Sequence, residues 1–127
     1  MNERKKILVI DDDPTHLLCA RDILEAHGYV VVFHPRAFGA TEKVMNEAPD
    51  LVLLDVNMPA LSGETLAVLL RSREQTRATR VVLYSSNDED SLRKTAYRLG
   101  LGPDGYVTKG DPAALRAAVD RALQAAP

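Results

Sequence analysis

Two short apolar segments that each end in acid constrain this chain more than any other feature. Residues 7–10 and residues 51–54 carry only aliphatic side chains, without the polar alternation of a half-exposed strand. Such runs are typical of parallel strands that are covered on both faces. An acidic triplet follows the first run at residues 11–13, and Asp55 follows the second. If these strands end at one edge of a sheet, the acids form an anionic pocket, which is costly unless a cation or a reaction requires it.

The rest of the chain alternates between strand-like and helix-like segments. The strand-like runs predict five strands, at residues 7–10, 29–33, 51–54, 81–84 and 105–107. Apolar residues at helical spacing fill the intervals and predict five helices, the last of which opens at Asp111 and Pro112. This alternation implies an α/β fold with right-handed crossovers and an open, doubly wound parallel sheet. In such sheets ligands bind beyond the carboxyl ends of the strands, where the acids of this chain lie.

Length, charge and cysteine content narrow the class of protein. We expect residues 1–127 to form one domain, with no output domain after it. The formal net charge of −2 gives no reason to expect nucleic acid or a membrane surface as a partner. The single cysteine, Cys19, excludes a disulfide within the chain, and the apolar run near the N-terminus is too short for a signal peptide or a membrane span. These observations predict a cytoplasmic protein.

The acids after the first and third strands suit a magnesium site. If these strands are neighbours, Asp55 faces Asp11 and Asp12. The first two acids could also cap the following helix, but Asp13, which precedes Pro14, fits that role best. Capping explains Asp55 poorly, because a loop-like segment follows it. Three carboxylates that offer only oxygen ligands suit Mg²⁺, which would also keep Asp55 ionised as a nucleophile.

Ser85 and Lys109 add two further polar groups at the same edge. Ser85 follows the fourth predicted strand, and Lys109 lies two residues after the fifth. Taken singly, they would be a turn serine and a solvated surface lysine. Together with a metal, they could contact three oxygens of a phosphoryl group on Asp55. Phosphoryl transfer needs mainly positioning and charge neutralisation, and these groups are of the types that can provide both.

In this order and spacing, these residues resemble a response regulator receiver domain across essentially the whole chain. The matching positions are Asp11, Asp12, Asp55, Asn57, Met58, Pro59, Gly63, Ser85 and residues 105–109, which read Gly-Tyr-Val-Thr-Lys. The resemblance implies a flavodoxin-like sheet with strand order 2-1-3-4-5. It also implies a signalling module of a two-component phosphorelay, which catalyses only its own phosphoryl transfer and autodephosphorylation.

The resemblance implies a role for each acid. Asp55 corresponds to the phosphoacceptor, which receives its phosphoryl group from a sensor histidine kinase or a histidine phosphotransfer protein. Asp12 corresponds to a direct Mg²⁺ ligand, and Asp11 to one that acts through water. Asp55 itself and the backbone carbonyl of Asn57 complete the implied ligand set.

The same resemblance implies a switch. Ser85 and Lys109 correspond to the residues that hold the phosphoryl oxygens, and Tyr106 to an aromatic residue that turns inward when the hydroxyl residue moves. The switch would change the surface around the fourth and fifth helices and control a downstream protein or a missing output domain. The alternative for Tyr106, a tyrosine that packs half-buried at a strand end, stays open.

Two positions depart from the family pattern. Gly110 follows Lys109 where the family usually has a proline, often after a cis peptide bond. Because a cis bond without proline costs about 3 kcal/mol, we expect a trans bond, with an effect on the reach of Lys109. Ser86 stands where alanine or glycine is usual. We hypothesise that it crowds the path of an attacking water and lengthens the phosphorylated lifetime.

Three alternatives compete with the receiver interpretation. Asp11, Asp13 and Thr15 also satisfy the opening pattern of haloacid-dehalogenase-like phosphatases, with Asp11 as the nucleophile, but that interpretation leaves Asp55 unexplained. A degenerate receiver that acts only as an interaction scaffold is kept open by Gly110. A flavin site is disfavoured, because the acidic turn would repel an FMN phosphate.

The remaining polar residues read as structural. His16, His27 and His34 have no metal-ligand spacing and no acidic companion in helical register, so we expect them at the surface or at helix ends. We expect Cys19 to be a small core residue beside the apolar stripe of the first helix. The basic residues of the third and fourth helices should form solvated faces.

Overall fold

The computed structural model of the protein describes residues 4–59 and 61–124. Within them, a five-stranded parallel sheet has the order β2-β1-β3-β4-β5, which confirms the predicted fold class and strand order. The strands are β1 (Lys6–Ile10), β2 (Val30–His34), β3 (Leu51–Leu54), β4 (Arg80–Ser85) and β5 (Tyr106–Thr108). Each strand begins and ends within one residue of its predicted run.

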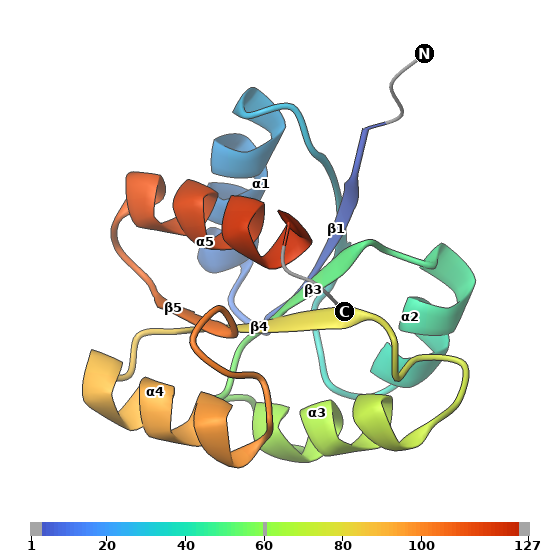
Figure 1. The fold of residues 1–127 in the computed structure, drawn as a ribbon. Coiled ribbons are helices and arrows are strands. Elements are labelled where there is room, and N and C mark those ends of the chain that lie inside the picture. Colours follow the sequence, from blue (N-terminus) through green and yellow to red (C-terminus); the bar gives the residue numbers. More distant parts are fainter. Residues whose placement is uncertain (1–3, 60, 125–127) are drawn as a thin grey trace.

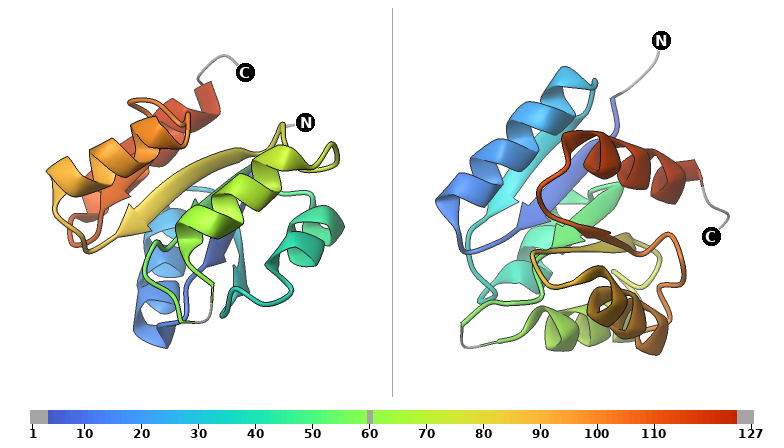
Figure 2. Two further views of the ribbon diagram at one scale, coloured as in Figure 1. Left: turned by 90° about the horizontal axis from the view of Figure 1, so that it is seen from below. Right: turned by 90° about the vertical axis from the view of Figure 1, so that its left-hand side faces the viewer.

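Helices cover both faces of the sheet, as the apolar strands require (Figure 1). The helices are α1 (Pro14–Ala26), α2 (Ala40–Glu47), α3 (Gly63–Ser72), α4 (Glu89–Arg98) and α5 (Pro112–Gln124). Helices α1 and α5 pack on one face, and α2, α3 and α4 pack on the other, as the two further views in Figure 2 show. The protein therefore has three layers and two hydrophobic cores.

Strand β1 shows why its run needs no polar alternation. Ile7 and Val9 belong to the core beneath α1 and α5, whereas Leu8 and Ile10 belong to the core beneath α2, α3 and α4. All four side chains are at most 1% exposed. Because successive residues of a strand point to opposite faces, a strand between two helical layers is apolar at every position.

The pairing of β1 with β3 places the two acidic segments side by side at the carboxyl edge of the sheet. Ile10 is in register with Leu54, and the Asp55 amide donates a hydrogen bond to the Ile10 carbonyl at 3.0 Å. Helix α3 then begins close to this strand end. A Cβ atom at Gly63 would lie 2.2 Å from the carbonyl oxygen of Asp55, so only glycine allows that approach.

The predicted helix starts are largely confirmed. Asp13 caps α1, because its side chain accepts a hydrogen bond from the Thr15 amide at 2.9 Å. Asp88 caps α4, because its side chain accepts a hydrogen bond from the Ser91 amide at 2.7 Å.

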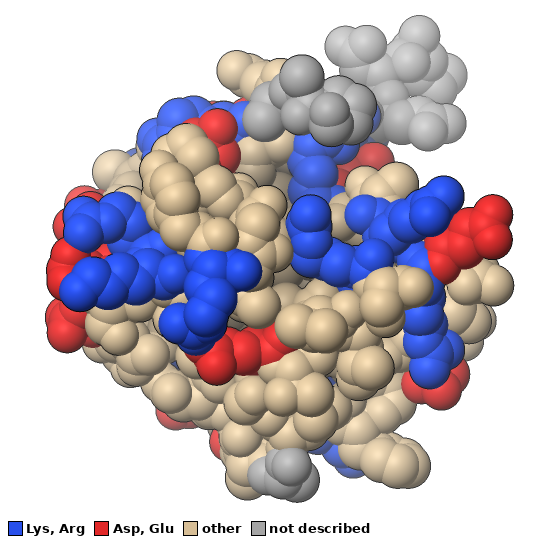
Figure 3. Space-filling view, turned by 60° about the horizontal axis from the view of Figure 1, so that its bottom comes forward, with Lys and Arg blue, Asp and Glu red and all other residues tan. Residues whose placement is uncertain are grey.

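Exposure corrects one prediction and confirms another. Cys19 is exposed rather than in the core, because the buried face of α1 consists of Leu17, Ala20 and Leu24, and residue 19 points away from it. The basic side chains of α3 and α4 lie at the surface as predicted, and Figure 3 shows Lys and Arg spread over that side of the molecule. None of the described helices is long and apolar enough to cross a membrane.

Candidate functional site

Three carboxylates converge at the carboxyl edge of the sheet. One oxygen atom each from Asp11, Asp12 and Asp55 lies within 4.8 Å of the other two. Asp11 and Asp55 are 1% and 6% exposed, whereas Asp12 is open to solvent. The predicted convergence of the acids is therefore confirmed, with two of the three carboxylates held in the protein interior.

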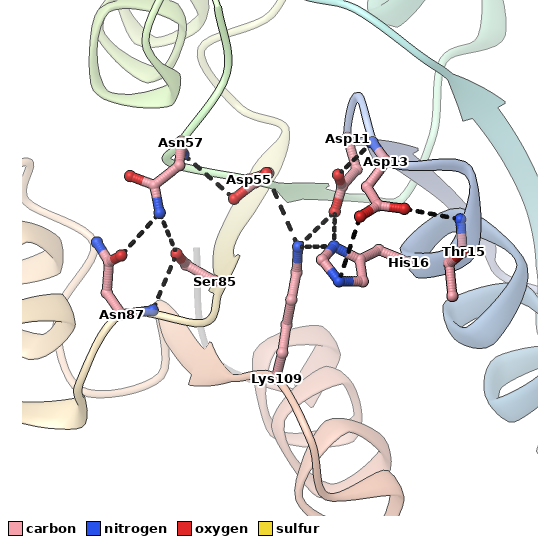
Figure 4. A network of polar contacts seen from close by, with 9 residues as sticks. All are labelled: Asp11, Asp13, Thr15, His16, Asp55, Asn57, Ser85, Asn87 and Lys109. Atoms are coloured by element: carbon pink, nitrogen blue, oxygen red, sulfur yellow. Dashed lines mark hydrogen bonds and ion pairs between the residues drawn. The ribbon is translucent and has the colours of Figure 1, made fainter.

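Lys109 is the cation that this structure places among the acids (Figure 4). Its Nζ atom lies 2.6 Å from Asp11 Oδ2 and 3.8 Å from Asp55 Oδ2. The backbone amide of Lys109 donates to the Ser85 carbonyl at 2.8 Å, which continues the pairing of β4 with β5. This hydrogen bond fixes the position of the Lys109 main chain beside the site. The peptide bond to Gly110 is trans, as predicted, and Gly110 has a φ of 118°.

Asp55 is held in an environment that disfavours its charge. Burial is the largest influence and raises the pKa of its carboxyl, and the neighbouring Asp11 and Asp12 raise it further. A hydrogen bond from the Asn57 amide at 3.2 Å and the charge of Lys109 act in the opposite direction without cancelling the rise. A cation bound by the three acids would remove this penalty, so the donor set fits a hard divalent ion.

Ser85 is held by two asparagines, only one of which the sequence pattern singled out. Its Oγ atom accepts hydrogen bonds from Asn57 Nδ2 at 3.2 Å and from the Asn87 amide at 3.3 Å. The two asparagine side chains also join each other at 2.7 Å. With both acceptor positions used, the Ser85 hydroxyl has its proton left to donate. Asn87 was not singled out from the sequence as a site residue, and the cap of α4 beside it is Asp88.

His16 lies in the first turn of α1, as its expected place at a helix end allows, and it also contacts the site, which the sequence did not predict (Figure 4). The Lys109 ammonium lies 2.7 Å from His16 Nδ1, with the lysine as donor. The imidazole also lies 3.6 Å from Asp11 and 3.7 Å from Asp13. Asp13 precedes His16 by three residues on α1, so an acidic companion in helical register was visible in the sequence and was missed.

The other two histidines lie outside the site. His27 is the C-cap of α1, and its Nε2 atom lies 2.9 Å from Asp120 Oδ2 on α5. His34 ends β2, and its Nε2 atom lies 2.7 Å from the Phe38 carbonyl. His27 therefore lies at a helix end, as predicted, whereas His34 is partly buried at the end of a strand.

Tyr106 is the first residue of β5, and Ser86 directly follows β4. Tyr106 is half-buried and packs against the core beneath α2, α3 and α4, which is the packing that its structural alternative describes. Ser86 is exposed beside the buried Ser85. The geometry is thus compatible with both interpretations of Tyr106, and its switch role stays a prediction.

Known proteins match this arrangement across most of the chain. The family described as "Response regulator receiver domain" matches residues 7–120. The protein-glutamate methylesterase/protein-glutamine glutaminase of Archaeoglobus fulgidus is 34% identical over 109 residues, 85% of this chain and 30% of that protein. The alkaline phosphatase synthesis transcriptional regulatory protein PhoP of Bacillus subtilis is 34% identical over 83% of this chain and 42% of its own length. The chain therefore spans less than half of the length of these relatives.

A solved structure agrees with the fold. The BeF3-activated N-terminal receiver domain of Klebsiella pneumoniae RstA superposes with a TM-score of 0.82 at 32% identity, over 94% of this chain and 99% of that one. The haloacid-dehalogenase-like alternative is set aside, because the family match includes the whole acidic site with Asp55 at its centre. The chain belongs to the response regulator receiver domains, which are modules of two-component signalling rather than enzymes.

Proposed function

We propose that Asp55 is the phosphoacceptor of this receiver domain. The observation that carries the proposal is the convergence of Asp11, Asp12 and Asp55 within 4.8 Å, with Lys109 beside them. A cluster of three carboxylates, two of them buried, is destabilising unless a cation offsets the charge. With that charge neutralised, an anionic phosphoryl group can approach Asp55.

In the proposed reaction, a carboxylate oxygen of Asp55 attacks the phosphorus atom of a phosphohistidine. The bond between phosphorus and the imidazole nitrogen breaks, the nitrogen keeps the electron pair, and an aspartyl phosphate forms. The partner is a sensor histidine kinase or a histidine phosphotransfer protein. Lys109 already lies 3.8 Å from Asp55 and would move from Asp11 to a phosphoryl oxygen. Ser85 would donate its free proton to another oxygen.

Magnesium fits the oxygen-only donors of this site. Asp11, Asp12, Asp55 and the backbone carbonyl of Asn57 would hold it. When bound, it supplies positive charge that neutralises the carboxylates and the phosphoryl oxygens. The raised pKa of the Asp55 carboxyl is the independent sign that such a charge is needed here, because Lys109 alone does not offset burial.

We propose further that phosphorylation is read out through Ser85 and Tyr106. Ser85 would move toward the phosphoryl group and leave its two asparagine partners, and Tyr106 would turn into the space behind it. The surface around α4 and α5 would then select a downstream protein or an output domain. The scaffold alternative depended on Gly110 misplacing Lys109, whereas the observed reach of Lys109 favours a working site.

The test is phosphorylation with acetyl phosphate and Mg²⁺, followed by intact-mass measurement. The wild type should gain one phosphoryl group, and Asp55→Asn should gain none. Asp22→Asn, which removes an exposed acid of α1 that pairs with Arg21, is the matched control and should behave as the wild type. Equal labelling of the wild type and Asp55→Asn would overturn the assignment.

A further inference from the structure

A cavity of about 320 Å³ lies between α1 and the start of α5. Its walls are formed by His16, Cys19 and Ile23 of α1, Tyr84 of β4 and residues 109–112. Most of the lining is apolar, and the volume is within the range of small-molecule sites in proteins. The cavity shares only His16 and Lys109 with the site described above.

Tyr84 is a lining residue of this cavity that carries a hydroxyl group. The residue is only 6% exposed, yet its hydroxyl has no hydrogen-bond partner among the described residues. No fully enclosed polar side-chain atom in the described part of the chain lacks a partner, so solvent must reach this hydroxyl. Tyr84 lines the cavity, which is open to solvent and so offers a route to this hydroxyl.

The hydroxyl is a donor at physiological pH. Burial raises the pKa of Tyr84 to about 12, with smaller contributions from the neighbouring Cys19 and Asp11. Lys109 Nζ lies 5.3 Å from the centre of the same ring, and this ammonium is already paired with Asp11. The cavity wall therefore carries one donor that solvent reaches and that no described residue accepts from.

The cavity is open to the outside at two positions. Cys19 is exposed, and a Cβ atom built at Gly110 would meet no atom within 4 Å. The charges around the cavity do not favour an ion, because Lys109 is satisfied and the carboxylate of Asp111 would repel an anion. Ile23, Tyr84 and Pro112 instead offer apolar surface for a ring.

We infer that this cavity binds a compact neutral molecule that has an apolar ring and one hydrogen-bond acceptor, such as a carbonyl oxygen, which faces the Tyr84 hydroxyl. A purely apolar side chain of a partner protein is the weaker occupant, since it would leave the hydroxyl desolvated and unpaired. This inference is independent of the proposed phosphorylation, because binding requires neither magnesium nor a phosphodonor.

The test is an NMR titration of the whole chain with acetophenone and with ethylbenzene, which has the same shape but lacks the carbonyl acceptor. Acetophenone should produce saturable shifts of amides that line the cavity, at low-millimolar concentration, and bind roughly fivefold more tightly than ethylbenzene. Tyr84→Phe should abolish the preference while ethylbenzene binding persists.

A second pair of variants separates binding from folding. Cys19→Phe places a ring at the open side of the cavity and should abolish the shifts, whereas Leu18→Phe changes an adjacent exposed residue of α1 that does not line the cavity and should preserve them. The inference is overturned if wild-type protein shows no saturable shifts, if the shifts map elsewhere, or if the preference for acetophenone survives Tyr84→Phe.

Discussion

Asp55 and Asp120 are two acids of one small domain whose surroundings act in opposite directions. At Asp120 on α5, burial alone would raise the pKa, but hydrogen bonds from the Tyr29 hydroxyl and His27 outweigh it, and the pKa is lowered. At Asp55, the hydrogen bond from Asn57 and the charge of Lys109 do not outweigh burial, and the pKa is raised. The fold stabilises the charged form of Asp120, whereas the groups around Asp55 do not offset the cost of burying its charge.

The difference separates a structural carboxylate from a functional one. The Asp120 group joins α5 to the end of α1 and to Tyr29, and each of its contacts stabilises the charged form. The Asp55 group has fewer donors and two acidic neighbours. A carboxylate that the protein leaves under-compensated is a candidate for metal binding or catalysis.

The largest expected effect on the rate comes from removing the ammonium group of Lys109 from the site. Lys109→Met should slow phosphorylation by acetyl phosphate by about 100-fold, because it removes a donor aimed at the transferred group. Initial rates from intact-mass measurements at saturating Mg²⁺ would report this. Lys94→Met, on the exposed face of α4, is the control and should retain the wild-type rate. An unchanged rate in Lys109→Met would remove Lys109 from the proposed mechanism.

Magnesium should change the stability of the site and leave the Asp120 region untouched. At a concentration of ten times its dissociation constant, Mg²⁺ should raise the free energy of unfolding by about 1.4 kcal/mol, since it binds the folded state. Urea denaturation with and without MgCl₂ would measure the difference. Asp12→Asn should reduce the gain, and Asp120→Asn should keep it in full. A gain of equal size in both variants would show that the ion acts elsewhere.

Neutralising Asp55 should stabilise the protein in the absence of metal. We expect Asp55→Asn to raise the free energy of unfolding by about 1 kcal/mol at neutral pH. The raised folded-state pKa means that the wild type loses stability as the pH rises from the ordinary carboxyl value of 3.8 through the folded value. The stabilisation by Asp55→Asn should therefore vanish at pH values below this range. A variant that is less stable than the wild type at neutral pH would contradict the environment described for Asp55.

Asp120→Asn should show the smallest effect, with the opposite sign. Because the pKa of Asp120 is lowered in the folded state, its contribution is present above the ordinary carboxyl pKa and is lost as the pH falls through the folded value. The group is partly exposed, so screening limits the loss at neutral pH to about 0.5 kcal/mol. Thermal unfolding at neutral and acidic pH would measure it. A larger destabilisation at acidic than at neutral pH would refute the sign.

Short-range patterns in the sequence predicted the strands and the acids at their ends, whereas the strand order that makes β1 and β3 neighbours came from the resemblance to receiver domains. The apolar runs that end in Asp11 and Asp55 fix the strands, and parallel pairing then fixes which residues are neighbours. The position of Lys109 follows in the same way from β5. These features depend on backbone geometry, which can be predicted from the hydrophobic pattern and the order of the strands and helices.

Features that depend on the direction of a side chain could not be predicted in this way. The contact of His16 with Lys109 joins residues 93 positions apart and requires the α1 face and the β5–α5 loop to meet. The exposure of Cys19 and the unpaired hydroxyl of Tyr84 likewise depend on how α1 lies on the sheet. Such details arise from tertiary packing rather than from any local pattern.

Gly63 has no reactive side chain, yet the backbone position of Asp55 depends on it. Its hydrogen takes up the space where a methyl group would collide with the main chain of Asp55. A mutational scan that scores phosphorylation should therefore find Gly63→Ala nearly as harmful as the loss of an acid, through displacement of the nucleophile rather than loss of charge. Steric room for the backbone is thus as much a requirement of this signalling centre as its carboxylates.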